Sequence, residues 1–299
     1  MRRATGAARA AALGLCWAAL AVAGQGPALA EGQQPDGAAV DSLLERGRLQ
    51  EAAWALREAG DTARADSVLA RLEAILRSPP VAARPLGMDS QGVSYTWRLD
   101  HGQGVESIFK VDGSDIFCPE CGADREVATY RLDRLLGFDI TPMTVSTSIV
   151  KPNGDTVSGS TMYFVNDART PTEAGATKPD ALRLFDAIVG NSDRHATNWL
   201  VVRDRVVAID HNRAFEYQPS TRPQTCWEGQ VDSLAAPGAL GSPWDRFRAL
   251  PADSFRTVLD GLDPDLAEQL LAMRPRVADR VQARAERPDT TLPRTDCLF

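Results

Sequence analysis

The chain has 299 residues, and 43% of them are hydrophobic, which is enough to build a folded core. Its 40 acidic residues outnumber its 33 basic ones, for a formal charge of −7. Non-specific nucleic-acid binding depends on basic side chains that neutralise phosphates, so we expect no nucleic-acid partner.

Residues 1–30 predict a secretory signal peptide. Arg2 and Arg3 precede an apolar run, and Ala28-Leu29-Ala30 is typical of a cleavage site. The apolar core is about 13 residues long, shorter than the roughly 20 that span a bilayer, although an N-terminal membrane anchor is the alternative. We expect export to the periplasm or the medium after cleavage near Ala30. The 33 basic residues then fall to 30 against 40 acidic ones, a formal charge of −10, with no transmembrane anchor left.

Four cysteines remain in the predicted mature chain, and an exported protein meets oxidising conditions. They are Cys118, Cys121, Cys226 and Cys297. Four cysteines allow three pairings, of which we expect Cys118–Cys121 with Cys226–Cys297. One zinc ion held by all four is the alternative, but zinc sites with this ligand set commonly contain two CxxC pairs and this chain has one.

Apolar residues recur at helical spacing from 39 to 77, and "EAGDT" interrupts them with a glycine and a capping residue. This pattern predicts a helical hairpin similar to one tetratricopeptide-like pair. A single pair cannot bury its own apolar face, so we expect it to dock on the main domain, and it also offers a surface to a protein partner. The prolines of "RSPPVAARP", residues 77–85, predict a linker.

The next stretch predicts strands. "VSYTWRL" alternates apolar and polar residues, "DHGQG" is typical of a turn, and "VESIFKV" forms a second strand that carries Lys110. After the CxxC loop, "REVATYRLDRLLGF" predicts a helix that Asp124 caps and Gly137 ends, with Glu126 in its first turn. "PMTVSTSIV" and "DTVSGSTMYFV", joined at Asn153-Gly154, predict a hairpin.

From residue 178 the pattern becomes helical. "KPDALRLFDAIVGN" places Leu182, Phe185 and Val189 on one face, and two or three more helices are expected between Pro243 and Arg287. The sequence therefore predicts an α+β fold, with a small β-rich part before a helical one and a short segment near 164–179 between them. Clefts between such parts commonly hold ligands.

Three polar residues surround one short predicted hairpin. Asp193 and Asn198 are spaced D-x-x-x-x-N, and Asp210 ends the strand "RVVAI". We expect "NWLVV" and "RVVAI" to pair through a turn at Asp204-Arg205, which brings Asn198 and Asp210 to one point with Asp193 just outside it. Such oxygen ligands suit Mg²⁺ or Mn²⁺, and a carboxylate beside the metal can orient a hydroxyl for phosphoryl transfer.

The motif "GNSDRHATNWLV…AIDHNRAF" resembles the catalytic core of an atypical kinase superfamily. Its members include HipA-type bacterial kinases, phosphatidylinositol 3- and 4-kinases, and Golgi casein-kinase-type secretory kinases. "IFKV" and "REVATYRLDRLLGFDITP" resemble the same group's lysine strand and glutamate-bearing helix. The resemblance extends from about residue 86 to residue 285. The motifs that are specific to the family cover about a fifth of that range.

The resemblance implies a two-lobed protein-kinase-like fold and a role for each matched residue. Lys110 would contact the nucleotide phosphates, and Glu126 would hold it by an ion pair. Asp193 would orient the acceptor hydroxyl or take its proton. Asn198 and Asp210 would bind the metal.

The resemblance also implies the nucleotide contacts. The backbone at Phe164 and Val165 would meet the adenine, and Ser90 to Ser94, including Gly92, would cover the phosphates. Two departures stand out. The phosphate-covering stretch has one glycine in place of a repeated pattern, and "DHN" replaces the Asp-Phe-Gly of ordinary protein kinases.

Each of these residues also has a structural interpretation. The three polar residues of the hairpin could be turn caps, since Asx residues are common in turns. Lys110 taken alone could be a surface lysine on a strand. His195 is expected to be a structural hydrogen-bonding residue, and Arg194 to pair with a nearby carboxylate.

We therefore expect an exported kinase that transfers the γ-phosphoryl group of ATP to a hydroxyl, using Mg²⁺ or Mn²⁺. The acceptor would be a protein Ser/Thr, a sugar or a lipid headgroup. The alternatives are a nucleotide-binding pseudokinase that acts as an interaction module, and an AMP transferase with the same site. The expected domains are a signal peptide (1–30), a helical hairpin with linker (31–85), and a kinase-like domain (86–299) with lobes 86–168 and 169–299.

Overall fold

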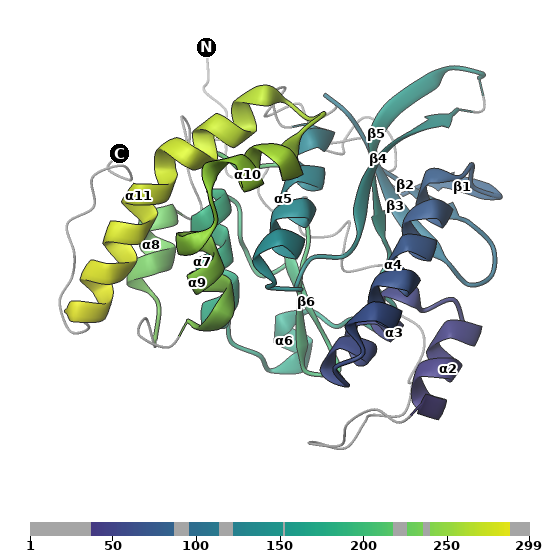
Figure 1. The fold of residues 1–299 in the computed structure, drawn as a ribbon. Coiled ribbons are helices and arrows are strands. Elements are labelled where there is room, and N and C mark those ends of the chain that lie inside the picture. The colour runs from purple at the N-terminus through teal and green to yellow at the C-terminus, as the bar shows by residue number, and fades with distance from the viewer. Residues whose placement is uncertain are drawn as a thin grey trace, which may run out of the picture.

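A computed structural model describes residues 37–86, 96–113, 122–151, 153–217, 226–235 and 240–287. Within these ranges the fold combines helices with a five-stranded antiparallel sheet and a separate two-stranded ribbon (Figure 1). The mixed α+β class is therefore confirmed. The division into lobes 86–168 and 169–299 stays a prediction.

The N-terminal segment contains three helices where a hairpin of two is predicted. They are α2 (Gly37–Glu45), α3 (Leu49–Glu58) and α4 (Thr62–Arg77). The extra break lies at Gly47, whose φ of 72° is left-handed and whose hydrogen atoms lie against the backbone of Gln103. The predicted "EAGDT" break is confirmed, because Gly60 has a φ of 81° and Asp61 caps α4 by accepting from the Arg64 amide.

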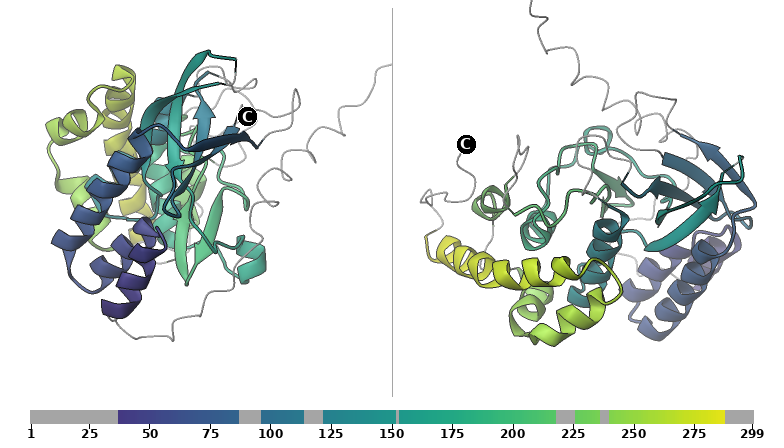
Figure 2. Two further views of the ribbon diagram at one scale, coloured as in Figure 1. Left: turned by 90° about the vertical axis from the view of Figure 1, so that its right-hand side faces the viewer. Right: turned by 90° about the horizontal axis from the view of Figure 1, so that it is seen from above.

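Helices α2–α4 pack against one side of the sheet, as expected of a unit that cannot bury its own apolar face (Figure 2). Leu49 and Leu72 are fully buried there, in one cluster with Ile108, Met162 and Tyr163 of the sheet. The N-terminal helices and the sheet therefore share a core.

The sheet has the strand order β1-β2-β3-β5-β4. Its strands are β1 (Ala82–Pro85), β2 (Thr96–Asp100), β3 (Glu106–Val111), β4 (Thr144–Val150) and β5 (Thr156–Tyr163). The predicted β4–β5 hairpin is confirmed, with Val150 paired to Thr156 around the Asn153-Gly154 turn. The linker prediction was wrong for β1, because Ala83 pairs with Leu99 and makes this stretch an edge strand, where prolines are tolerated.

The remaining helices are α5 (Ala123–Leu136), α6 (Pro171–Ala174), α7 (Asp180–Val189), α8 (Trp227–Asp232), α9 (Gly241–Ala249), α10 (Ala252–Leu259) and α11 (Pro264–Glu286). Along the chain, α5 lies between β3 and β4, and α6 to α11 come after β5. Helix α5 begins one residue before the predicted cap, so Gly122 occupies the N-cap position and Asp124 lies in the first turn. Gly137, with a φ of 80°, ends α5 as predicted.

A second core lies among the helices. Leu182, Phe185 and Val189 of α7 are fully buried, as their spacing predicts, and pack in one cluster with α5 and α8–α11. Helix α5 lies between the sheet and helices α9 and α10 (Figure 1), so it contacts both cores. The ribbon strands contribute to both clusters as well.

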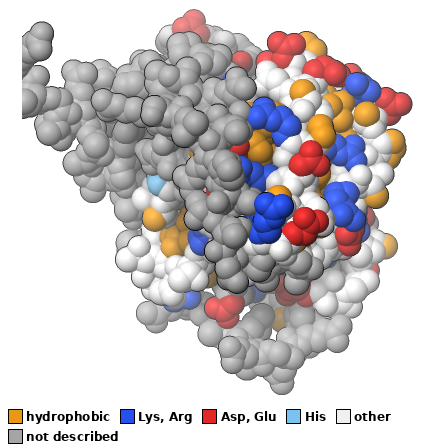
Figure 3. All heavy atoms as spheres, turned by 90° about the vertical axis from the view of Figure 1, so that its left-hand side faces the viewer, with side chains coloured by type: hydrophobic (Ala, Val, Ile, Leu, Met, Phe, Trp, Pro, Cys, Tyr) orange, Lys and Arg blue, Asp and Glu red, His pale blue; other side chains and the backbone are white. Residues whose placement is uncertain are grey.

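Where Figure 3 colours the side chains, acidic and basic ones are interspersed with apolar ones. Within the described ranges, no helix combines the length and the hydropathy that a membrane span requires.

Candidate functional site

The ribbon that carries the motif consists of β6 (Trp199–Val202) and β7 (Arg205–Ala208). Val202 pairs with Arg205, so the turn is Arg203-Asp204 and lies one residue earlier than predicted. Both turn residues have positive φ, 48° and 65°, which matches the right-handed twist of a two-residue hairpin. The ribbon places Asn198 at the start of one strand and Asp210 just past the end of the other.

Arg194 connects the two ends of this ribbon. Its guanidinium bonds both carboxylate oxygens of Asp186, at 3.0 and 3.1 Å, which confirms the expected carboxylate partner. It also donates to the carbonyl oxygens of Asn198 and, at 2.6 Å, Ile209. Both charged side chains are fully buried, which is tolerable only because the guanidinium is paired and hydrogen-bonded. This organising role is one that the sequence alone does not reveal.

Asn198 is held with its amide nitrogen toward the motif loop. The side-chain Nδ2 of Asn198 donates to the backbone carbonyl of Asp193 at 2.8 Å. The backbone carbonyl of Asn198 accepts from the Ile209 amide at 3.1 Å. Asp210 follows Ile209 directly in the chain, so the Asp193–Asn198 loop and Asp210 lie at the same end of the ribbon. That the side-chain oxygens of Asn198 and Asp210 face one cation stays a prediction.

Lys110 reaches the same place from β3. Its Nζ lies 2.5 Å from Oε1 of Glu126 on α5 and 2.6 Å from Oδ1 of Asp210. Burial alone would lower the pKa of Lys110, but Asp210 and Glu126 outweigh it and raise that pKa above its ordinary value. Burial would likewise raise the pKa of Asp210, and Lys110 lowers it instead. The lysine therefore stays charged between two carboxylates.

Asp193 lies beside this group and is electrostatically linked to it. Burial, reinforced by the charge of Asp210, raises the pKa of Asp193, while His195 acts in the opposite direction. His195 places Nδ1 at 2.8 Å from the Thr197 hydroxyl, and its Nε2 lies 3.8 Å from Asp193. The hydrogen bond to Thr197 agrees with the structural role expected for His195.

His211 is a further buried residue of the site, and the motif that contains it predicts no role for it. Its Nε2 lies 2.7 Å from Nη2 of Arg194. Burial, together with the charges of Arg194 and Lys110, holds the pKa of His211 well below its usual range. A neutral ring can accept the hydrogen bond from Arg194, so His211 is one more buried partner of the guanidinium.

Phe164 and Val165 follow β5, the strand that pairs with the Lys110 strand. The Phe164 amide donates to the Glu106 carbonyl at 2.9 Å, and Val165 is buried. Arg98 lies over the Phe164 ring, 4.1 Å from its centroid. The predicted phosphate-covering residues Gly92 and Ser94, within the Ser90–Ser94 stretch, lie outside the described residues.

Of the four predicted mature-chain cysteines, Cys226 lies within the residues that the structure describes, and it is disulfide-bonded. Cys118, Cys121 and Cys297 lie outside the described residues, so the pairing Cys226–Cys297 stays a prediction. Among the residues that the structure describes, no group of three His, Cys, Asp or Glu side chains is placed to hold a metal ion. A cation at the motif would rely on the amide of Asn198 beside the carboxylates.

No family model matches the sequence, and no curated protein matches it. Solved structures do. The structure of hydra Fam20 with sugar has 15% identity and a TM-score of 0.50, over 75% of this chain and 91% of that one. The Golgi casein kinase has 17% identity and a TM-score of 0.50, over 74% of this chain and 75% of that one.

The Golgi casein kinase with Mn/ADP bound also matches, at 17% identity and a TM-score of 0.50, over 74% of this chain and 76% of that one. Such identities carry the fold alone. The expected resemblance to the Golgi casein-kinase type of atypical kinase is thereby confirmed at that level, and this chain has a kinase-like fold similar to the Fam20 and Golgi casein kinase structures.

Proposed function

We propose that the protein is an ATP-dependent kinase that transfers the γ-phosphoryl group to a hydroxyl. The observation that carries the proposal is the buried ion-pair group in which Lys110 joins Glu126 to Asp210, beside the Asp193–Asn198 loop. The likeness to a structure with Mn/ADP bound supports it. In this proposal the β-rich part and the helical part act as the two lobes.

The residues of the site divide the work. Lys110, kept in place by Glu126, contacts the nucleotide phosphates. Asp193 orients the acceptor hydroxyl and takes its proton, for which its raised pKa is suited. Asp210 and the side-chain oxygen of Asn198 form a hard oxygen donor set that fits Mg²⁺ or Mn²⁺. When bound, such an ion neutralises charge on the phosphates.

The acceptor is proposed as a hydroxyl of a protein, a sugar or a lipid headgroup. The neighbours support this breadth, since one is a structure with sugar and another is named a casein kinase. Export through the signal peptide, with disulfides formed outside the cytoplasm, is part of the same proposal, and so is adenine contact at Phe164 and Val165.

The test uses purified protein with ATP and Mn²⁺. We expect a rise in melting temperature with the nucleotide, and transfer of label from γ-labelled ATP to an acceptor in a panel of proteins, sugars and lipids. Transfer from α-labelled ATP only would indicate an AMP transferase. A thermal shift without any transfer would favour an interaction module, and no nucleotide binding at all would refute the proposal.

A further inference from the structure

The last residue of β5 and the segment that follows it, residues 163–167, are held by two charged residues at the start of α3. Arg48, the residue that precedes α3, donates from Nη2 to the Asn166 carbonyl at 3.1 Å, and its Nη1 lies 2.5 Å from the Asp167 carboxylate. Arg48 is buried, with 6% of its surface exposed. An arginine buried in this way acts as a fixed clamp because its planar donors lose little freedom on bonding.

Glu51, one turn further along α3, holds the same segment from the other side. Its Oε1 accepts from the Asn166 amide at 3.2 Å, and its Oε2 accepts from the Tyr163 hydroxyl at 2.7 Å. Arg48 Nε lies 3.5 Å from Glu51 Oε1, so the two residues also support each other. Together Arg48 and Glu51 bind the backbone N–H and C=O groups of Asn166. They also bind the side chains of Tyr163 and Asp167.

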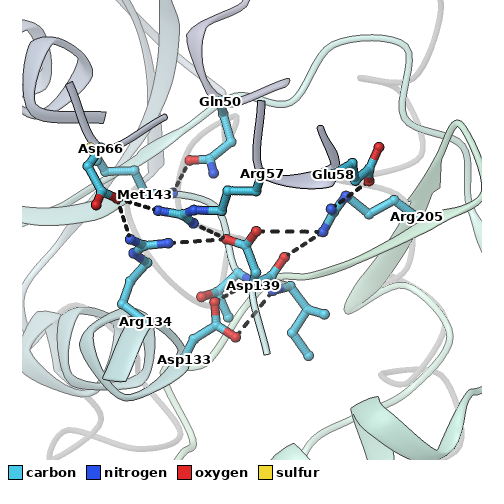
Figure 4. A network of polar contacts seen from close by, with 11 residues as sticks. Gln50, Arg57, Glu58, Asp66, Asp133, Arg134, Asp139, Met143 and Arg205 are labelled. Carbon is cyan, nitrogen blue, oxygen red and sulfur yellow. Dashed lines mark hydrogen bonds and ion pairs between the residues drawn. The ribbon is translucent and has the colours of Figure 1, made fainter. Parts of the chain in front are cut away.

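The same helices are also linked, around Asp139, to elements that carry residues of the site (Figure 4). Arg57 of α3 lies 2.8 Å from the Asp139 carboxylate, which Arg134 of α5 approaches to 3.4 Å. Arg205 of β7 donates to the Asp139 carbonyl at 2.9 Å and lies 2.7 Å from Glu58 of α3. Helix α3 is therefore linked through Asp139 to the helix that carries Glu126, and through Glu58 directly to the strand that leads to Asp210.

From these contacts we infer that helices α2–α4 are a positioning element for the nucleotide, with Arg48 and Glu51 as its positioning residues. The inference rests on the proposed function, in which the Phe164–Val165 backbone meets the adenine. Asp167 has a φ of 56°, a conformation that non-glycine residues adopt at a cost, so the segment needs outside contacts to keep its shape.

The expected effect is on nucleotide affinity and not on the chemical step. If the clamp is removed, the nucleotide must order the segment on binding, and that cost weakens affinity. The Asp193 loop is held separately, through Arg194. Once the nucleotide is bound, turnover should then proceed as in the parent.

The test compares Arg48→Met with a matched control on the same helices. Arg64→Met removes an exposed ion pair between Arg64 and Asp41. For Arg48→Met we expect about tenfold weaker ATP binding by calorimetry and a similar rise in KM, with kcat within about twofold of the parent. Arg48→Lys should recover part of the affinity, and Arg64→Met should leave affinity and KM unchanged.

Hydrogen exchange at residues 163–167 makes the outcome independent of activity. We expect faster exchange of the Asn166 amide in Arg48→Met than in the parent or the control. If Arg48→Met exchanges the Asn166 amide and binds ATP as the parent does, Arg48 is a structural contact only and the inference is overturned. A lower melting temperature of the variant would not change that conclusion. If the parent itself fails to bind ATP, the proposed function fails, while exchange at Asn166 still decides whether Arg48 holds the segment.

Discussion

Asp193 and Asp210 lie in one small site, and the proposed kinase activity gives them different tasks. Asp193→Asn removes the proton-accepting oxygen but keeps the shape of the side chain, so nucleotide binding should remain while turnover falls by about 10²- to 10⁴-fold. Asp210→Ala removes a carboxylate ligand of the cation, so Mn²⁺-dependent nucleotide binding should itself be lost. Calorimetry and labelled-ATP turnover check both variants, and parent-like behaviour of both would show that the site is assigned wrongly.

Lys110 should also contribute strongly to stability, because it separates two carboxylates in a buried place. Lys110→Met leaves those charges without their cation, and we expect a loss of about 3–5 kcal/mol in the free energy of unfolding. Adding Glu126→Gln removes one of the two charges and should recover part of that loss. Urea unfolding at pH 8 measures the cycle, and additive losses would contradict the interpretation as one coupled group.

An exposed ion pair provides the control for that cycle. Arg77 and Glu73 lie 2.9 Å apart on α4, and close to half of each side chain is exposed. Such pairs contribute little, so Arg77→Met should change the unfolding free energy by less than about 1 kcal/mol.

Asp133 predicts a pH dependence of stability. Burial, with the nearby charge of Asp139, raises its pKa to about 7, although the amides of Ile140 and Thr141 donate to it. The unfolded carboxyl ionises near its ordinary pKa of 3.8, so the folded state binds more protons between pH 4 and 7. This group's stabilising contribution is complete below pH 4 and is lost as the pH rises to 7, by at most about 1.4 kcal/mol per pH unit.

Comparison with Asp133→Asn isolates this contribution. The amide does not titrate, so the variant should lack the part of the pH slope that belongs to Asp133. Chemical unfolding of both proteins from pH 4 to 7.5 gives the two slopes, and equal slopes would mean that Asp133 is ionised in the folded protein throughout.

At the scale of elements, the β6–β7 ribbon is built around a turn whose residues are poorly matched to it. Arg203 and Asp204 both have positive φ and are both exposed. Asn-Gly is the preferred pair for such a turn, so Arg203→Asn with Asp204→Gly should raise the free energy of unfolding by about 1 kcal/mol. Asp204→Val, a β-branched residue in the same conformation, should lower it, and thermal unfolding of both variants makes the comparison.

At the scale of the whole molecule, the N-terminal helices belong to the folded body. They cover Ile108 and Met162 of the sheet, together with Val105 just before β3, and all three are buried. Deleting residues 37–77 would expose this apolar surface to water, so we expect an aggregated product. Size-exclusion chromatography with circular dichroism checks this expectation. A monomeric product with cooperative unfolding would instead show that the helices are a separate unit.

The elements and the residues of the motif could be predicted where the signal is local. The alternation that leads into β2, the Gly137 stop of α5 and the spacing from Asp193 to Asp210 are each visible within a short stretch of sequence. The pairing of Lys110 with Glu126 followed from the family resemblance, because two separate elements must meet to form it.

What the sequence did not show depends on contacts between distant residues. Strand β1 exists because it pairs with β2, while the prolines within and before it indicate a linker. The break at Gly47 depends on Gln103, which lies far along the chain. A carboxylate partner was expected for Arg194, but its hydrogen bonds to the carbonyl oxygens of Asn198 and Ile209 become visible only once the ribbon is folded.

Gly159 of β5 limits how this sheet can change. A methyl group added to it would lie 2.0 Å from the carbonyl oxygen of Lys110 on the adjacent strand, and that atom cannot move without moving β3. Even alanine at position 159 would force the two backbones apart and carry the lysine with them. A library that randomises the buried face of β5 should therefore recover glycine at this one position, whatever apolar residues it accepts at the others.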